Sequence, residues 1–198
     1  MRPPLRGKMR RIKFSETIPG CDRRHYLTEE DVMVVLSRLP EETWQRLRTV
    51  HFNDRSNGAR VLGYVDNGHS EITICALPPR LSLSAALAKG QSCEQFDAKR
   101  GEKWPPLAVR RYLLYDVFLH ELGHLQLVNE RTKSERLRFA REKFAQEFAD
   151  RWRKKLWSEH FDHPDPVHNA PVRIQCVGQV PNLPYTFLDE SLMSQASP

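Results

Sequence analysis

The pattern H-E-x-x-H stands inside the apolar run Tyr115-Asp-Val-Phe-Leu-His-Glu-Leu-Gly-His-Leu125. On a helix that turns about 100° per residue, two side chains four positions apart lie about 40° from each other, so the imidazoles of His120 and His124 can reach one metal ion. Glu121 can stay outside the ligand shell and act as general base for a water that the metal activates. We therefore predict a metal site on this helix, with His120 and His124 as ligands.

The chain has the size and composition of one globular domain with irregular ends. Its 198 residues are 39% hydrophobic, and many of its 14 prolines gather toward the termini and the connections. We predict a disordered basic arm over residues 1–20, a folded domain over residues 21–160, and a Pro-rich extension over residues 161–198 that runs along the surface as coil.

Positive charge is concentrated at the N-terminus. The net charge is +6, and residues 2–13 carry six Arg or Lys side chains without any acid. Such an arm can make weak, salt-sensitive contact with nucleic acid through the phosphate charge, or it can simply be solvated.

The remaining composition favours a cytoplasmic protein. No apolar run approaches the roughly 20 residues that span a bilayer, so we expect no membrane association. The N-terminus lacks the apolar core of a secretory signal. Cys21, Cys75, Cys93 and Cys176 are scattered without a C-x-x-C pair, which is typical of free thiols in a reducing compartment.

Short helices and strands are predicted before the motif. A helix begins after Thr28, a good N-cap residue followed by acids, and ends at Pro40. The further predicted elements are a short helix over Glu41–Leu47, a strand over Thr49–Phe52, a hairpin of Arg60–Val65 and Glu71–Cys75 with Asn67-Gly68 in its turn, and a short helix over Leu83–Lys89.

Two long helices are predicted next. Leu107–Val128 forms one amphipathic helix that carries the motif, and Thr132–Trp157 forms the second. The apolar stripe of the second helix is expected at Leu137, Ala140, Phe144, Phe148, Trp152 and Leu156. Because a small sheet precedes two long helices, the predicted fold class is α+β.

A catalytic metal site needs a third protein ligand and an open position for water. One candidate is Glu130, the sixth residue after His124, although Leu127 replaces the glycine expected before it. A second source is the group of three histidines downstream, which a coil could fold back: His160, His163 and His168.

The third source is a glutamate of the second long helix. Glu142 and Glu147 lie at the flanks of the apolar stripe and point about 140° away from each other, so at most one of them faces the metal. Helical periodicity alone does not choose between them.

A family resemblance bears on this choice. The pattern H-E-L-G-H followed by Glu142-Lys-Phe-Ala-Gln-Glu-Phe-Ala149 resembles the gluzincin-like metallopeptidases, most closely the ImmA/IrrE-type group, over roughly residues 60–157. The resemblance implies a small zincin-like (minimal gluzincin) domain with a short antiparallel or mixed sheet, one Zn²⁺ per chain, and Glu142 as its third ligand. Gln146 replaces the Asn or Asp that usually steadies a ligand in this family. Glu71–Cys75 is similar to the edge strand that borders the zincin cleft.

The implied function is a zinc-dependent metallopeptidase that hydrolyses peptide bonds of a protein or peptide substrate, with Glu121 as general base. Substrate would lie extended along the edge strand. The candidate donors to the developing oxyanion are His160, His163, His168, Tyr112 and Tyr185.

Two other hypotheses stay open. A catalytically silent zincin-fold protein could bind a partner protein or DNA and use the metal for structure alone, although such a protein would not need Glu121. Alternatively, His120 and His124 could pack on an apolar helix without any metal.

Overall fold

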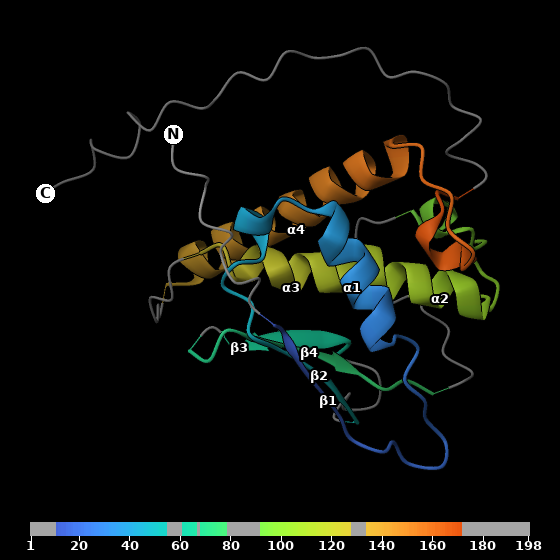
Figure 1. The fold of residues 1–198 in the computed structure, drawn as a ribbon, viewed down its shortest axis with the longest axis horizontal. Helices are drawn as coiled ribbons and strands as arrows, with labels where there is room; N and C mark the ends of the chain where they lie inside the picture. The colour runs from blue at the N-terminus through green and yellow to red at the C-terminus, as the bar shows by residue number, and fades with distance from the viewer. Residues whose placement is uncertain (1–10, 55–60, 67, 79–91, 128–133, 172–198) are drawn as a thin grey trace, which may run out of the picture.

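The computed structural model describes residues 11–54, 61–66, 68–78, 92–127 and 134–171. Within these ranges the fold is α+β, as predicted: a mixed sheet forms one layer, and the helices lie over one of its faces (Figure 1). Four predicted features fall outside these ranges, namely the helix over Leu83–Lys89, the ligand candidate Glu130, the donor candidate Tyr185, and Cys176.

The sheet has the strand order β1-β2-β4-β3, with β1 at Lys13–Glu16, β2 at Thr49–Asn53, β3 at Gly63–Asp66 and β4 at Glu71–Cys75. β1 and β4 both pair in parallel with β2, whereas β3 pairs antiparallel with β4. The predicted strand and the predicted hairpin are therefore confirmed. The face toward the helices buries Val50, Phe52, Ile72 and Ile74.

The prediction that Glu71–Cys75 is an edge strand is wrong, because β2 and β3 flank β4 on its two sides. The edge strand beside the helices is β3. Its Gly63 packs so closely that a Cβ atom there would lie 2.9 Å from Cγ1 of Val117.

The predicted disordered arm over residues 1–20 is also wrong in its second half, where β1 pairs with β2. Ile12 is buried, and the ring of Phe14 stacks on that of Phe52 with centroids 6.4 Å apart. Two apolar side chains in a basic segment gain this burial only when β2, far along the chain, lies beside them. Local composition therefore could not indicate the strand.

Helix α1 (Glu29–Arg38) begins after the predicted N-cap Thr28, which forms a capping box. The Thr28 hydroxyl accepts from the Asp31 N–H at 3.2 Å, and the Asp31 carboxylate accepts from the Thr28 N–H at 3.0 Å. Beyond Pro40 the chain forms only the single 3₁₀ turn η1 (Glu41–Thr43), shorter than the predicted helix, because it must turn into β2.

The motif lies on one continuous helical rod made of α2 (Pro106–Tyr112), the π-helical segment η3 (Leu113–Phe118) and α3 (Leu119–His124). The predicted helix Leu107–Val128 is confirmed in position but ends at His124. All six side chains of η3 are buried, since the sheet, α1 and α4 surround the rod.

Helix α4 (Glu135–Ser158) packs along α3, close to the predicted Thr132–Trp157. The predicted stripe is wrong in the first part of the helix, where Leu137 is 52% and Phe144 39% exposed. The buried face instead runs through Ala145 and Ala149, whose small side chains let α3 approach but carry little periodic signal.

The domain extends past its predicted end at residue 160. Val167 and His168, in the short 3₁₀ helix η4 (Pro166–His168), are buried, which contradicts a surface coil for this part of the extension. Arg110 of α2 binds Asp165 at 2.7 Å, and the Arg111 guanidinium donates to the Pro166 carbonyl at 2.9 Å. The charged side chains of α2 thus hold this segment at Asp165 and Pro166.

Among the helices described, none combines the length and apolar character that a membrane crossing requires. Cys21, Cys75 and Cys93 are free thiols, as predicted.

Candidate metal centre

Three side chains converge where α3 and α4 lie against each other. The Nε2 atoms of His120 and His124 are 3.1 Å apart. Glu142 of α4 places Oε2 at 3.3 Å from Nε2 of His120 and Oε1 at 3.5 Å from Nε2 of His124. The structure thus brings together the two histidines of the motif and the glutamate that the family resemblance implied.

These separations fit the donor set of one zinc ion. Tetrahedral zinc holds nitrogen or oxygen ligands at about 2.0–2.2 Å, which places neighbouring donor atoms about 3.3–3.5 Å apart. Two imidazoles and one carboxylate are also ligands that suit zinc. The side chain of Glu142 is 63% exposed, so one side of the group faces solvent.

Gly123 allows α4 to come this close. A Cβ atom on Gly123 would lie 2.9 Å from Cα of Ala145 and 3.1 Å from its carbonyl oxygen. Gly123 thus lets α4 pass close to α3. The same contact brings Glu142, one helical turn before Ala145, over the histidines.

Burial shifts the pKa values of His124 and Glu121 at this centre. Burial lowers the pKa of His124, and the neighbouring His120 lowers it further. Burial raises the pKa of Glu121 to about 8, and the negative charge of Glu142 adds to the shift. Neutral imidazole is the form that binds a metal.

Gln146 orients His120 from behind. Its Oε1 accepts a hydrogen bond from Nδ1 of His120 at 3.2 Å. Its Nε2 donates to Oδ1 of Asp116 and to Oδ1 of Asp150, both at 3.2 Å. Because two carboxylates engage the amide nitrogen, the amide oxygen must face His120, and Nδ1 must carry the proton. The lone pair of His120 is thereby left on Nε2, which points at Glu142.

The buried carboxylate of Asp116 completes this support. Asp116 is 4% exposed and forms an ion pair with Arg153, which also pairs with Asp150. We did not predict these three residues. The available signal was Asp116 itself, a single acid four positions before His120 in an otherwise apolar helical run.

The other ligand candidates lie elsewhere. Glu147 pairs with Lys143 at 3.8 Å on the exposed side of α4. His168 is buried with Nε2 at 3.5 Å from Asp31, and the ring of His163 packs against it at 4.5 Å between centroids. In the part of the chain that the structure describes, neither these two nor His160 joins the group of His120, His124 and Glu142.

Tyr112 is not placed to act as an oxyanion donor. It is 3% exposed, and its ring packs edge-on against Phe96 and Trp104, with centroids 5.1 and 5.6 Å away. Burial raises the pKa of its phenol. Tyr112 therefore belongs to an aromatic core cluster. The other tyrosine candidate for the oxyanion donor, Tyr185, lies outside the described residues.

No family model, curated protein or solved structure matches the chain. The interpretation of the centre therefore rests on its geometry and chemistry.

Proposed function

We propose that this protein is a zinc-dependent metallopeptidase of the zincin type, in which His120, His124 and Glu142 hold the ion and Glu121 is the general base. The observation that carries the proposal is the convergence of three side chains, whose donor atoms lie 3.1–3.5 Å apart, beside the buried Glu121 of α3. A purely structural site would have no use for Glu121. When bound, zinc supplies Lewis acidity, which polarises a carbonyl and makes water more acidic.

Glu121 and Gln146 have different roles in the proposed hydrolysis. Glu121 takes a proton from the attacking water while the water oxygen adds to the carbonyl carbon of the peptide bond. As the C–N bond breaks, Glu121 passes the proton to the leaving nitrogen. Gln146 keeps His120 in the tautomer whose Nε2 is free, so that the ligand set is organised before substrate arrives.

The free edge of β3 is the proposed place for substrate. Among the described strands, β3 has a neighbour on one side only, and it lies next to α3. An extended peptide could pair with its unpaired N–H and C=O groups and run past the donor group. We therefore still propose that substrate binds as an added strand, but along β3 and not along β4.

Metal content and cleavage test the proposal together. Purified wild type should carry about one zinc per chain by plasma mass spectrometry, and His124→Ala and Glu142→Ala should lose it. Glu121→Gln should keep the zinc but lose cleavage of a proteome-derived peptide library by at least about 100-fold, since general-base catalysis contributes that much. Glu147→Ala, on the same helix but outside the group, is the matched control.

Two outcomes would overturn the proposal. A wild-type protein that takes up no zinc, even after zinc is added back, would leave the histidines as packed core side chains. Cleavage that survives Glu121→Gln would remove the general base, and with it the proposed mechanism.

A further inference from the structure

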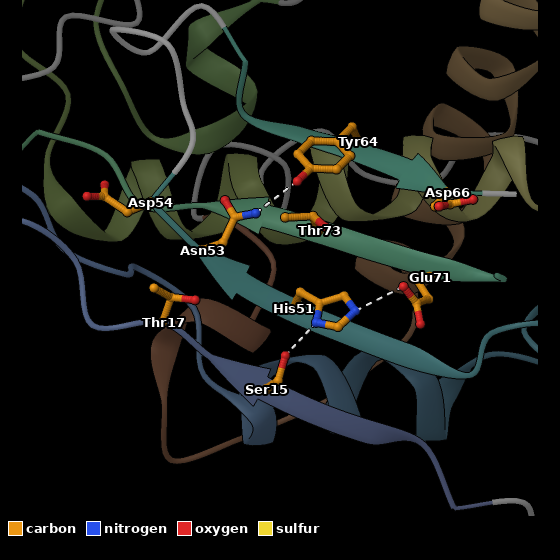
Figure 2. Close-up of a pocket in the computed structure, with 9 residues that line it drawn as sticks. All are labelled: Ser15, Thr17, His51, Asn53, Asp54, Tyr64, Asp66, Glu71 and Thr73. Atoms are coloured by element: carbon orange, nitrogen blue, oxygen red, sulfur yellow. Dashed lines mark hydrogen bonds and ion pairs between the residues drawn. The ribbon is translucent and has the colours of Figure 1, made fainter. Parts of the chain in front are cut away.

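A second polar site lies on the face of the sheet that points away from the helices of the metal centre. Because side chains alternate along a strand, His51 points opposite to its neighbours Val50 and Phe52, which face the helices. Figure 2 shows the pocket on this face, which encloses about 480 Å³. Three of its lining side chains form one chain of contacts across β1, β2 and β4, namely Ser15, His51 and Glu71. A hydroxyl, an imidazole and a carboxylate in this order are the groups that activate a nucleophilic serine.

The pairing of the strands places the three side chains and determines the tautomer of the imidazole. Ser15 of β1 is the register partner of His51 on β2, and its hydroxyl contacts Nδ1 of the ring. On the other side, Nε2 of His51 lies 3.2 Å from a carboxylate oxygen of Glu71 on β4. Since an ionised carboxylate accepts hydrogen bonds and donates none, Nε2 carries the ring proton and Nδ1 keeps a lone pair. Ser15 therefore donates its hydroxyl proton to His51.

Two further polar side chains stand one step along the same face. Thr17 lies two residues beyond Ser15 and Asn53 two residues beyond His51, and both line the pocket. The Asn53 amide donates to the Tyr64 hydroxyl at 2.9 Å, which orients its nitrogen within the pocket (Figure 2). A hydroxyl and an amide are the kinds of donor that stabilise the oxyanion formed when a nucleophile adds to a carbonyl.

The charge and the exposure of the pocket indicate which substrates can reach the serine. The lining residues include the carboxylates of Asp54, Asp66 and Glu71 but neither Lys nor Arg. An anionic acyl donor would be repelled by these groups, whereas an uncharged ester would not. The side chains of His51 and Glu71 are 32% and 33% exposed, so a small ester can approach from solvent.

We propose that Ser15 is the nucleophile of a second, metal-independent active site that hydrolyses small uncharged esters. The Ser15 oxygen bonds to the carbonyl carbon of the ester while its proton moves to Nδ1 of His51, and Glu71 stabilises the imidazolium through Nε2. As the bond to the leaving alcohol oxygen breaks, His51 gives the proton to that oxygen. A water molecule then passes a proton to His51 and adds to the acyl carbon. The acyl group leaves as the carboxylic acid, and the Ser15 oxygen regains its proton from His51.

Labelling of the full chain with an uncharged fluorophosphonate ester tests the proposal, because an activated serine oxygen bonds to its phosphorus and displaces fluoride. Wild type should take up one equivalent at Ser15, located by tandem mass spectrometry, at a rate that EDTA does not change. Ser15→Ala should remove this label. His51→Gln should label at least about 100-fold more slowly, since a general base contributes that much. Glu71→Gln should label at least about tenfold more slowly, because the imidazolium loses its counter-charge.

Ser37→Ala serves as the matched control and should label like wild type, since Ser37 is exposed on α1, donates to the Val34 carbonyl at 2.8 Å and lies outside the pocket. Circular dichroism spectra that match wild type would establish that each variant is folded. The proposal is overturned if Ser15 of the wild type takes up no probe. It is equally overturned if His51→Gln labels at the wild-type rate, because the hydroxyl would then be no more reactive than that of an ordinary serine.

Discussion

At the scale of single residues, the metal centre depends on side chains that are not ligand candidates themselves but orient His120. His120 can bind a metal through Nε2 because Gln146 accepts its Nδ1 proton. The orientation of Gln146 is in turn determined by Asp116 and Asp150. The Gln146 amide oxygen is therefore available to His120 because the carboxylates of Asp116 and Asp150 hold the amide nitrogen.

Replacing Gln146 with Leu should weaken zinc binding about 10- to 100-fold, because His120 would lose the acceptor that selects its tautomer. Competition with a chromophoric chelator measures this affinity directly. Glu147→Gln, one position further on α4 and paired with Lys143, should bind zinc like wild type. An unchanged affinity in Gln146→Leu would mean that another group orients His120.

At the scale of elements, the decisive contact is the close packing of α3 on α4. Gly123 and Ala145 leave no side-chain volume between the two helices, and this is what brings Glu142 over His120 and His124. Glu147 stands five residues later on the same helix and faces away. The distance between the helices therefore determines which glutamate joins the histidines.

Gly123→Ala should destabilise the protein, although alanine is the better helix former by about 1 kcal/mol. The added Cβ would lie 2.9 Å from Cα of Ala145 and 3.1 Å from Cβ of Phe148, so α4 would have to move. We expect a net loss of about 1–3 kcal/mol in the free energy of unfolding, measured by urea denaturation.

Zinc affinity should fall in the same variant, since Glu142 moves with α4. Gly20→Ala is the control, because its nearest neighbour outside the adjacent residues would lie 3.4 Å away, an ordinary contact. If Gly123→Ala were as stable as wild type, the helices would tolerate a wider spacing than the structure indicates.

At the scale of the whole molecule, one buried acid joins three distant segments. Asp31 of α1 accepts from Arg110 of α2 at 2.8 Å and lies 3.5 Å from Nε2 of His168 in the C-terminal segment. Burial alone would raise the pKa of Asp31, but the hydrogen bonds from His168 and the Thr28 N–H, with the charge of Arg110, outweigh it and lower the pKa.

A lowered pKa in the folded state makes this contribution dependent on pH. The stabilisation from Asp31 is fully present above the ordinary carboxyl pKa of about 3.9 and is lost as the pH falls through the lower folded value. We expect Asp31→Asn to melt below wild type at pH 7. The difference in Tm between the two proteins should shrink as the pH is lowered from 5 to 3. A constant difference across that range would contradict the proposed linkage.

The sequence by itself determined the features that depend on neighbouring residues. The capping box at Thr28, the hairpin of β3 and β4, the two long helices and the placement of His120, Glu121 and His124 on one helix face all follow from periodicity and local hydrogen bonding. These signals act over a few residues, so they can be read without knowing the fold.

Only the tertiary structure decided which distant segments meet. It placed β1 in the sheet, buried Val167 and His168 against α2, and brought Glu142 and Gln146 to His120. Each of these outcomes depends on burial and on pairing across tens of residues, where the favourable free energy appears only after the partner is in place. That is why composition suggested a disordered arm and a surface coil at positions where the folded chain forms a strand and a buried turn.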